Sequence, residues 1–468
     1  MAEEQEGSVF QRTRIVPWPV DSYPPWGFSI IAGFQHIFTL FGATTLVPIL
    51  FGQAMGMNSQ QLGILIATVY LMTGIGTLLQ CDSRIGSGLP IVQGSSFSFI
   101  TPAIAIFDNV KKGGGGVNEM MTAFGSALFY GGIYELIVGY SGLIGLLKRI
   151  ITPVVIGPTI MLIGFSLAGT AVSTASSYWP ISILGVILIF VFALVIKNQY
   201  LNSFPVFVTV VLLYLFAVLG TAVGLFKTGH PMFINFQTIA EAPWIVWPRP
   251  LRYGNIFKFD TFAFAAIVAA FTSSMIESFG DYHSVSYASG LPDPTPEMIS
   301  KGIGSEGLGC MISGIFGGVA TTSYTENIGV VELTGIASRR VIRTGAVILI
   351  IFGFVWKLGT IIGTMPSPII GAAYLSLFGL IGALGVQVFT RCDVTSTRNI
   401  MILGFSFLFG LGLPSVISAN PIVIPGATWL ANILNGILRT SMAVGGISAA
   451  ILDNLIPGTD KERGIGVR

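Results

Sequence analysis

Residues 320–335 read ATTSYTENIGVVELTG, and this stretch decides how the whole chain is interpreted. It lies among hydrophobic segments, yet it carries two carboxylates, Glu326 and Glu332, together with Asn327 and two glycines. An ionised residue near the middle of a bilayer costs about 2.5–3.5 kcal/mol on insertion scales, so such residues are rare and usually functional. The stretch is also too polar and too rich in glycine for an ordinary membrane helix. It predicts a membrane helix that is interrupted at a functional site.

The composition indicates a polytopic membrane protein. The chain has 468 residues, of which 52% are hydrophobic and only 9% are charged, and its mean hydropathy is +0.80. A soluble domain carries about 25% charged residues. A membrane-spanning helix needs about 20 mostly apolar residues. The sequence on this basis predicts an all-α integral membrane protein with about fourteen spans, near 27–51, 60–80, 88–107, 120–147, 152–173, 180–197, 204–226, 261–288, 302–319, 320–337, 341–363, 366–391, 396–417 and 427–453.

The long segment 227–258 separates these spans into two halves of seven. It is rich in proline and tryptophan, and we expect it to be an outer loop. The expected organisation is a cytoplasmic N-terminal tail at 1–26, a first repeat at 27–226, this loop, a second repeat at 259–455 and a cytoplasmic tail at 456–468.

Lysines and arginines are distributed unequally between the two expected sides. A cytoplasmic N-terminus gives its side Arg12, Arg14, Arg84, Lys148, Arg149, Lys197, Lys301, Arg339, Arg340, Arg343, Arg391, Arg398, Lys461, Arg463 and Arg468. The opposite side receives only Lys111, Lys112, Lys227, Arg249, Arg252, Lys258 and Lys357. The positive-inside rule then places both termini in the cytoplasm, as an even number of spans requires.

The two halves resemble each other weakly. ITPVVIGPTIMLIG at 151–164 is similar to PSPIIGAAYLSLFG at 366–379, and PIVQGSSFSFI at 90–100 occupies the place that 320–335 occupies in the second half. Because seven is an odd number, the second half enters the membrane from the opposite side. Inverted repeats with interrupted helices in corresponding positions are typical of secondary transporters, whose binding site lies at the repeat interface.

The eighth predicted span contains SSMIESFGDYHSVS, which places Glu277 and Asp281 four residues apart. On a helix the two carboxylates share one face and repel each other if both are ionised. We expect one of them to be protonated during part of a cycle, as a proton-coupling group would be. The alternative is that they lie near a helix end in water, or that they bond to nearby hydroxyl groups.

The interrupted third and tenth spans supply matching polar groups. A helix break leaves backbone N–H and C=O groups unpaired, and Glu326 and Asn327 stand at the break in the tenth span. Carboxylates accept hydrogen bonds, whereas an amide both donates and accepts, and this set suits a flat heterocycle with N–H and C=O groups side by side. Gln93, Ser95, Ser96 and Phe97 add polar groups and an aromatic face from the third span. Close packing of small residues is the alternative interpretation of this second set.

Four further polar residues lie within predicted spans. Gln35 and His36 are polar in the first span, where a histidine is as readily a packing residue as a functional one. Glu306 lies close to the tenth span and is expected to orient it or to relay protons. Glu135 is also intramembrane, and the sequence names no partner for it.

Several classes of protein find no support in the sequence. It has no HExxH, GxSxG or Walker motif, and its three cysteines have no CxxC spacing, so an enzyme, a disulfide framework and a metal site are not expected. The net charge of +2 does not suggest a nucleic acid as partner. No cofactor is expected, and the expected coupling ion is a proton, with sodium as the alternative.

These residues resemble a known family, the nucleobase–ascorbate transporters (nucleobase:cation symporter family 2). Its tenth-span motif, roughly [Q/E/P]-N-x-G-x-x-x-x-T-[G/K/R], is matched by Glu326, Asn327, Gly329, Thr334 and Gly335. Its first-span QH pair corresponds to Gln35 and His36. Its eighth-span pattern E-x-x-G-D corresponds to Glu277, Gly280 and Asp281. The resemblance extends from about residue 25 to 455.

The resemblance implies two inverted seven-helix repeats, with a core domain of spans 1–4 and 8–11 and a gate domain of spans 5–7 and 12–14. It also implies a homodimer in the cell membrane and proton symport by an elevator-like movement. The substrate-binding residues it implies, together with those suggested above, are Glu277, Glu326, Asn327, Phe97, Ser96 and Gln93. The residues that would assist coupling or support the site are Asp281, His36, Glu306 and Gln35.

The substrate signals conflict. Glu326 resembles the uracil-permease branch, whereas Asp281 matches purine and ascorbate members. The run TGIASRR at 334–340 looks closer to xanthine and urate permeases, and Thr325 departs from the glycine common in uracil permeases. Two carboxylates accept the two ring N–H donors of uracil, which we favour, although xanthine or urate offers similar donors. An anion exchanger of the same fold is a further alternative. Two carboxylates at its anion site would disfavour it.

Overall fold

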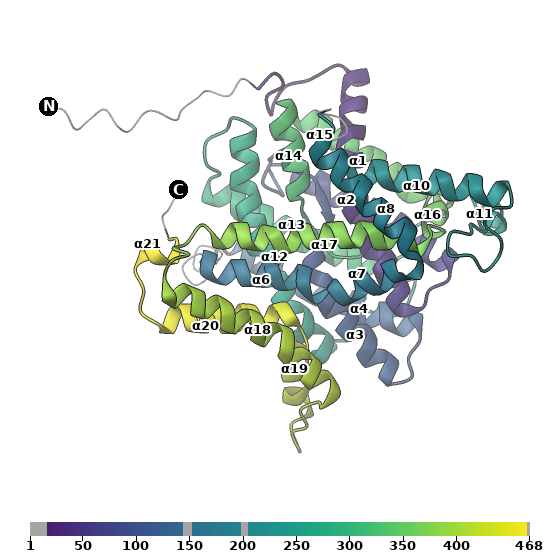
Figure 1. Ribbon diagram of the computed structural model, residues 1–468. Helices are drawn as coiled ribbons and strands as arrows, with labels where there is room; N and C mark the ends of the chain where they lie inside the picture. Colours follow the sequence, from purple (N-terminus) through teal and green to yellow (C-terminus); the bar gives the residue numbers. More distant parts are fainter. Residues whose placement is uncertain (1–15, 144–151, 198–204, 466–468) are drawn as a thin grey trace.

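The computed structural model describes residues 16–143, 152–197 and 205–465, which are mostly helical (Figure 1). The first half contains α1 (Trp26–Met55), α2 (Ser59–Gln80), β1 (Gln93–Ser95), the 3₁₀ helix η1 (Phe97–Phe99), α3 (Ile100–Lys112), α4 (Val117–Tyr140), α6 (Pro153–Ser166), α7 (Ala168–Ala175), η2 (Ser176–Tyr178), α8 (Trp179–Phe190), the π-helical turn η3 (Val191–Val195) and α10 (Pro205–Ala222). The second half contains α11 (Phe236–Glu241), α12 (Thr261–Ala288), α13 (Pro296–Phe316), β2 (Thr321–Ser323), α14 (Thr325–Thr334), α15 (Arg339–Phe354), α16 (Trp356–Gly363), α17 (Ser367–Phe389), α18 (Thr397–Ala419), α19 (Thr428–Leu438), α20 (Ser441–Leu455) and α21 (Asp460–Arg463).

Among these elements, eight helical stretches are long and apolar enough to cross a membrane by themselves. The helices follow the predicted spans in order, and the exact number of crossings stays a prediction. Three spans that hydropathy predicts as single helices are divided, at Leu167, at Val355 and at Arg439–Thr440. Val355 and Thr440 have extended backbone torsions (ψ 87° and 109°), although apolar residues continue on both sides. Hydropathy does not detect such breaks. The end of the predicted span 120–147 lies outside the described residues.

The two interrupted spans meet as short antiparallel strands. β1 pairs with β2 in the register Gln93↔Ser323, Gly94↔Thr322 and Ser95↔Thr321. Two glycines with positive φ set the ends of the second segment: Gly317 (φ 71°) ends α13 and Gly335 (φ 67°) ends α14. The predicted breaks at the third and tenth spans are thus confirmed, and each takes the form of a strand followed by a helix.

Helices α4 and α13 pack antiparallel with their backbones in contact along a row of glycines. A Cβ atom on Gly139 would lie 2.3 Å from the backbone nitrogen of Gly304, and one on Gly132 would lie 2.6 Å from the carbonyl oxygen of Gly307. The contact continues at the other end, where a Cβ on Gly125 would lie 3.0 Å from a carbonyl oxygen of α13. Small residues permit this approach in membrane helices. The spacing of seven residues on α4 keeps the glycines on one face.

The same arrangement recurs between α2 and the pair α15–α16. A Cβ atom on Gly74 would lie 2.6 Å from the carbonyl oxygen of Ala346, and one on Gly359 would lie 2.3 Å from that of Gly63. In two repeats of seven spans, the second span corresponds to the ninth and the fourth corresponds to the eleventh. The pair α2–α15 therefore corresponds to the pair α13–α4, as expected for inverted repeats.

Helices α6, α8, α10, α17, α18 and α20 belong to the gate domain. There α6 packs along α17 and α20, and α18 packs on α20 (Figure 1). The similar segments 151–164 and 366–379 lie within or near this contact: a Cβ on Gly164 would be 2.4 Å from the carbonyl oxygen of Phe378. Core and gate meet mainly where α12 contacts α19, α20 and α6.

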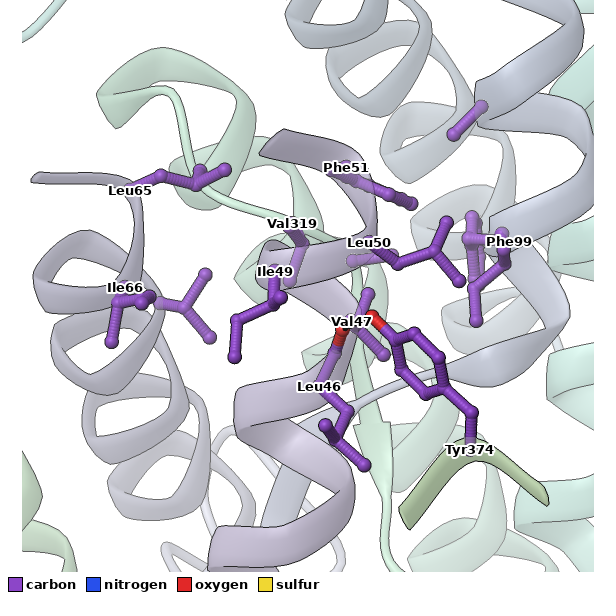
Figure 2. Packing of buried hydrophobic residues seen from close by; sticks show 14 of the residues in the cluster. Leu46, Val47, Ile49, Leu50, Phe51, Leu65, Ile66, Phe99, Val319 and Tyr374 are labelled. Carbon is purple, nitrogen blue, oxygen red and sulfur yellow. Dashed lines mark hydrogen bonds between the residues drawn. The ribbon is translucent and has the colours of Figure 1, made fainter. Parts of the chain in front are cut away.

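Buried side chains join the two domains around α1. Figure 2 shows Leu46, Ile49 and Leu50 between α2 and the rings of Phe99 and Tyr374. The Tyr374 hydroxyl, which comes from gate helix α17, donates a hydrogen bond of 3.1 Å to the carbonyl oxygen of Leu46. The core domain is thus packed against the gate through an apolar contact with one buried polar bond at its centre.

The shortest link between the domains is the turn at 364–366, which joins α16 to α17. The amide of Thr364 donates to the carbonyl oxygen of Thr360 at 3.0 Å. Tyr214 of the gate helix α10 lies 3.0 Å from the Thr364 hydroxyl and donates to the carbonyl oxygen of Ile361 at 3.1 Å. A gate side chain therefore holds the end of a core helix.

We predict that Gly139→Ala destabilises the core domain. Its methyl group has no space against the backbone of α13, so the helices must separate, at a cost of about 1–3 kcal/mol. The measurement is the melting temperature of the purified protein in detergent. The matched control is Gly404→Ala in α18, where nothing lies within 4 Å of the new atom. Its melting temperature should stay equal or rise, since alanine favours helix over glycine. Equal melting temperatures for wild type and Gly139→Ala would contradict the glycine contact.

Candidate functional site

The site is built where two helices begin in the middle of the molecule. η1 and α3 follow β1, and α14 follows β2, so two helix N-termini start beside the strand pair. The first N–H groups of a helix have no partner within it, and they carry a partial positive charge. Glu326 stands in the first turn of α14. Both predicted polar clusters therefore lie at ends of helices that can offer backbone donors.

Glu306 of α13 joins the surrounding elements. Its carboxylate accepts hydrogen bonds from Ser278 Oγ at 2.6 Å, from the Tyr282 hydroxyl at 2.7 Å and from the backbone N–H of Ser323 at 3.1 Å. Gln93 Nε2 of β1 donates to it at 3.3 Å. The Glu306 side chain is buried. The predicted orienting residue is thus placed against both strands and α12.

Asp281 lies on α12 beside the start of α14. One of its oxygens accepts a hydrogen bond from Ser323 Oγ at 3.0 Å, and the other accepts one from Thr325 Oγ1 at 2.9 Å. Asp281 is buried, whereas Glu277, one turn earlier on the same helix, is half-buried. Both oxygens of Asp281 are therefore used in hydrogen bonds at the start of α14, and Glu277 is the carboxyl group of this pair that is accessible to a ligand.

His36 connects α1 to the broken helix. The Asn327 side-chain amide lies 3.1 Å from His36 Nδ1 and donates to the His36 carbonyl oxygen at 3.0 Å. Both side chains are buried. Gln35 is half-buried in the neighbouring position, and within the described part of the chain its side chain makes no hydrogen bond to this cluster. The histidine predicted as a supporting residue thus positions Asn327.

Several buried polar atoms at the two breaks lack a hydrogen-bond partner within the described ranges. They are Ser96 Oγ, Gln93 Oε1 and Asn327 Oδ1. Most buried polar groups in native proteins are paired, so a concentration of unpaired ones calls for an explanation. A polar ligand bound between the helix ends would supply the missing partners.

A cavity of about 160 Å³ reaches Glu277 from the gate side. It lies between α6, α12 and α20, and its walls are mostly apolar, with hydroxyl groups from Thr159, Thr272 and Ser273. Glu277 is the one charged residue in its lining. The cavity places an open space between core and gate next to a candidate binding residue.

Phe97 follows β1 and faces the gate. Its ring is half-buried and meets the ring of Phe378 edge to face, with centroids 6.1 Å apart. Phe378 in turn stacks on Tyr374 at 5.0 Å. Close to Phe97 in the chain, Gly94 leaves room for the ring of Tyr324, because a Cβ atom on Gly94 would lie 2.3 Å from that ring. An aromatic contact thus closes the gate side of the broken segments.

The carboxyl groups of the site have no cationic partner. The ion pairs recorded for the described residues join Glu297, Asp21 and Asp453 to lysine or arginine, and none of them involves the site. The carboxyl groups of Glu277, Asp281, Glu306 and Glu326 therefore depend on hydrogen bonds and on protonation. Asp281 and Glu306 are buried, and Glu277 and Glu326 are half-buried, so keeping all four as anions without such compensation would be costly.

Sequence reasoning missed some of these residues. Ser278, Tyr282 and Ser323 are ordinary in sequence, and only the fold brings them to Glu306. The spacing of Ser278 and Tyr282, one turn apart on the face of Asp281, is a signal that was available. Glu332 lies on an exposed face of α14, away from the cluster that contains Glu326.

Comparison with known proteins identifies the family. A family model described as Permease family matches residues 27–419. This chain belongs to the nucleobase–ascorbate transporter family. Mouse solute carrier family 23 member 2 is 34% identical over 511 residues, which cover 99% of this chain and 78% of that protein. Nucleobase-ascorbate transporter 8 of Arabidopsis thaliana is 31% identical and covers 95% of this chain and 87% of that protein.

Solved structures show the fold of this transporter. The transmembrane domain of the cyanobacterial bicarbonate transporter BicA matches with a TM-score of 0.58 at 14% identity, covering 90% of this chain and 99% of that one. The structure of SLC26A9 matches with a TM-score of 0.57 at 10% identity, covering 82% and 62% of the two chains. The inverted-repeat fold with core and gate domains is therefore confirmed.

We predict that Glu306→Gln in this transporter lowers both stability and uptake. The amide nitrogen would face donors that now point at a carboxylate, and each buried donor left unpaired costs about 1–3 kcal/mol. The melting temperature and substrate uptake are the measurements. Glu297→Gln is the matched control, because it removes an exposed charge from the same helix. Unchanged stability and uptake in Glu306→Gln would contradict the role of Glu306 as the centre of this network.

Proposed function

We propose that the protein is a secondary active transporter that imports a nucleobase, with uracil favoured, by proton symport. The observation that carries this proposal is the group of unpaired buried polar atoms at the two helix breaks, beside carboxyl groups without cations. These groups suit a small neutral molecule that offers both N–H and C=O groups.

In this proposal Glu277 and Glu326 accept the two ring N–H groups of uracil. The first backbone N–H groups of η1, near Phe97, donate to a carbonyl oxygen of the base. Ser96, Gln93 and Asn327 supply the remaining polar contacts. The ring of Phe97 packs against the flat face of the base, as aromatic rings do with heterocycles.

Proton coupling follows from the charge of the site. A base that donates to Glu277 and Glu326 favours their ionised forms, whereas burial without cations favours their protonated forms. Binding of substrate and binding of protons are then linked. Asp281 and His36 hold the geometry of α14, through Thr325 and Asn327 respectively. A sodium ion is the alternative coupling ion, and an imposed sodium gradient tests it.

Transport in this proposal is a movement of the core against the gate. The site residues lie on core elements, and the cavity at Glu277 lies between the core helix α12 and the gate helices α6 and α20. Few polar bonds cross the boundary beside the site, and one of these joins Thr101 to Ser166 at 3.2 Å. A displacement there breaks little polar bonding. The proposal includes a homodimer in the cell membrane with both termini in the cytoplasm.

Purines and ascorbate are the alternative substrates. Xanthine and urate carry N–H and C=O groups like those of uracil. The Arabidopsis relative is named a nucleobase-ascorbate transporter, so ascorbate belongs among the substrates to test. Ascorbate is an anion at neutral pH, and carboxylates at Glu277 and Glu326 would repel it unless both are protonated. An inorganic anion meets the same obstacle, which disfavours an anion exchanger.

We predict that Glu326→Gln strongly weakens uracil uptake and shifts the preference toward purines. The amide presents a donor where the carboxylate presents only acceptors. A hydrogen bond to a charged group is worth about 1.5–3 kcal/mol, which corresponds to roughly ten- to hundredfold in affinity. The measurement is uptake into proteoliposomes under an imposed pH gradient, with competition by uracil, xanthine, urate and ascorbate.

The control is Glu332→Gln, which removes an exposed carboxylate from the same helix and should keep wild-type uptake. An unchanged competition profile in Glu326→Gln would remove that residue from the binding site. Uptake by the wild type that depends on chloride or bicarbonate and ignores nucleobases would overturn the proposed function itself.

A further inference from the structure

Glu135 of α4 is a buried acid that the proposed mechanism does not use. Its side chain is fully buried, with 0% exposure. Neither of its carboxyl oxygens has a hydrogen-bond partner within the described residues. Glu306, which is equally buried, accepts four hydrogen bonds. The two acids therefore differ sharply in the number of hydrogen bonds that the protein donates to them.

Glu135 lies in the glycine contact between α4 and α13. A Cβ atom on Gly307 would lie 3.1 Å from the carbonyl carbon of Glu135 and 2.5 Å from the backbone nitrogen of Leu136. Gly307 directly follows Glu306 in the chain. The close approach of these helices thus brings Glu135 beside the network centred on Glu306.

The titratable groups that face Glu135 come from two helices. On α13 they are Glu306 and Cys310, and on α12 the group is Tyr282, whose hydroxyl already donates to Glu306. The titratable side chains of α3, which also packs on α4, are Asp108, Lys111 and Lys112, and all three are exposed near the end of that helix. The groups facing Glu135 are therefore acids, and none of them is a cation.

These surroundings assign different protonation states to the two acids. A buried carboxylate with neither a donor nor a cation is far more costly than the neutral acid. Four donors stabilise the Glu306 carboxylate, because hydrogen bonds to a charged group are among the strongest in proteins. The neutral form of Glu135 is therefore favoured, and Glu306 is the better stabilised of the two as an anion.

We propose that Glu135 is a second proton-binding site of the transport cycle, which exchanges its proton with Glu306. The O–H bond at Glu135 breaks and one forms on a carboxylate oxygen of Glu306, so the charge of the pair does not change. An acceptor for the new O–H group is present, because Gln93 Oε1 is buried without a partner next to the amide nitrogen that now donates to Glu306. Gln80 Nε2 is a buried donor without a partner in the same network, where Gln80 accepts from Ser305.

This inference rests on the proposed proton symport and adds that Glu135 releases its proton during the cycle. A purely structural Glu135 stays neutral throughout the cycle. A glutamine, which has nearly the same shape and is always neutral, would then replace it without effect on transport. A Glu135 that gives up its proton has no such substitute. The variant Glu135→Gln therefore separates the two roles.

The test compares two modes of transport in proteoliposomes that contain wild type or Glu135→Gln. Exchange of labelled for unlabelled nucleobase at equal pH requires binding and movement but no net proton release. We expect exchange to stay within about twofold of wild type, while accumulation driven by a pH gradient falls by at least about tenfold. Proton uptake with substrate, followed by a pH-sensitive dye, should fall in parallel.

Two further variants complete the experiment. Glu119→Gln removes an exposed carboxylate from the same helix and retains an oxygen that can accept from the Gly116 amide, so both modes should stay at wild-type level. Glu135→Asp keeps an acid at the position and should restore pH-driven accumulation. It also serves as the test if Glu135→Gln does not fold.

Each outcome decides a different question. Normal pH-driven accumulation by Glu135→Gln overturns the inference and leaves the proposed function intact. If Glu135→Gln does not fold, failure of the folded Glu135→Asp to accumulate substrate overturns the inference. A wild type that accumulates nucleobase without any response to the pH gradient overturns proton symport, and the inference fails with it. Loss of both exchange and accumulation in a folded Glu135→Gln assigns Glu135 to binding or movement and also overturns the inference.

Discussion

The Glu306 side chain is buried and forms no ion pair among the described residues, and this constraint organises the core domain. An anion in this position is tolerated only when donors surround it. The donors come from Gln93 of β1, from Ser278 and Tyr282 of α12 and from the backbone of β2. The network thus holds β1 of the first half of the chain against α12, α13 and β2 of the second half. The broken helices are positioned by this network, and the candidate site depends on their position.

Direct contacts between helix backbones make that arrangement rigid. Where α4 meets α13 and α2 meets α15, glycines bring backbones into direct contact and leave little room for sliding. The boundary between core and gate is different, because aromatic rings and a cavity lie there. A stiff core beside a loosely bonded boundary is the mechanical arrangement that movement of a whole domain requires.

The sequence contains the information for the broken helices but not for their contacts. Polar residues within an apolar segment marked 93–97, and carboxylates and glycines marked 320–335. Both segments became strands followed by helices. The breaks at Val355 and Thr440 were missed, because they depend on backbone torsions within continuous apolar sequence. Glu306 was predicted only as a helper, since its donors are single residues scattered over three elements. Glu135 could not be interpreted at all. Its significance is that its carboxyl oxygens have no hydrogen-bond partner among the described residues, and only the fold shows this.

The turn at 364–366 is a short covalent connection between the core helix α16 and the gate helix α17. From Gly363 to Ser367 the chain spans at most about 14 Å when fully extended. In the fold it forms a compact turn, and Tyr214 of the gate hydrogen-bonds to the residues around it. The segment 223–260, between α10 and α12, is much longer. If the core moves against the gate as proposed, a tether this short keeps the core near Gly363 close to the gate, and the displacement of other parts of the core grows with their distance from the turn.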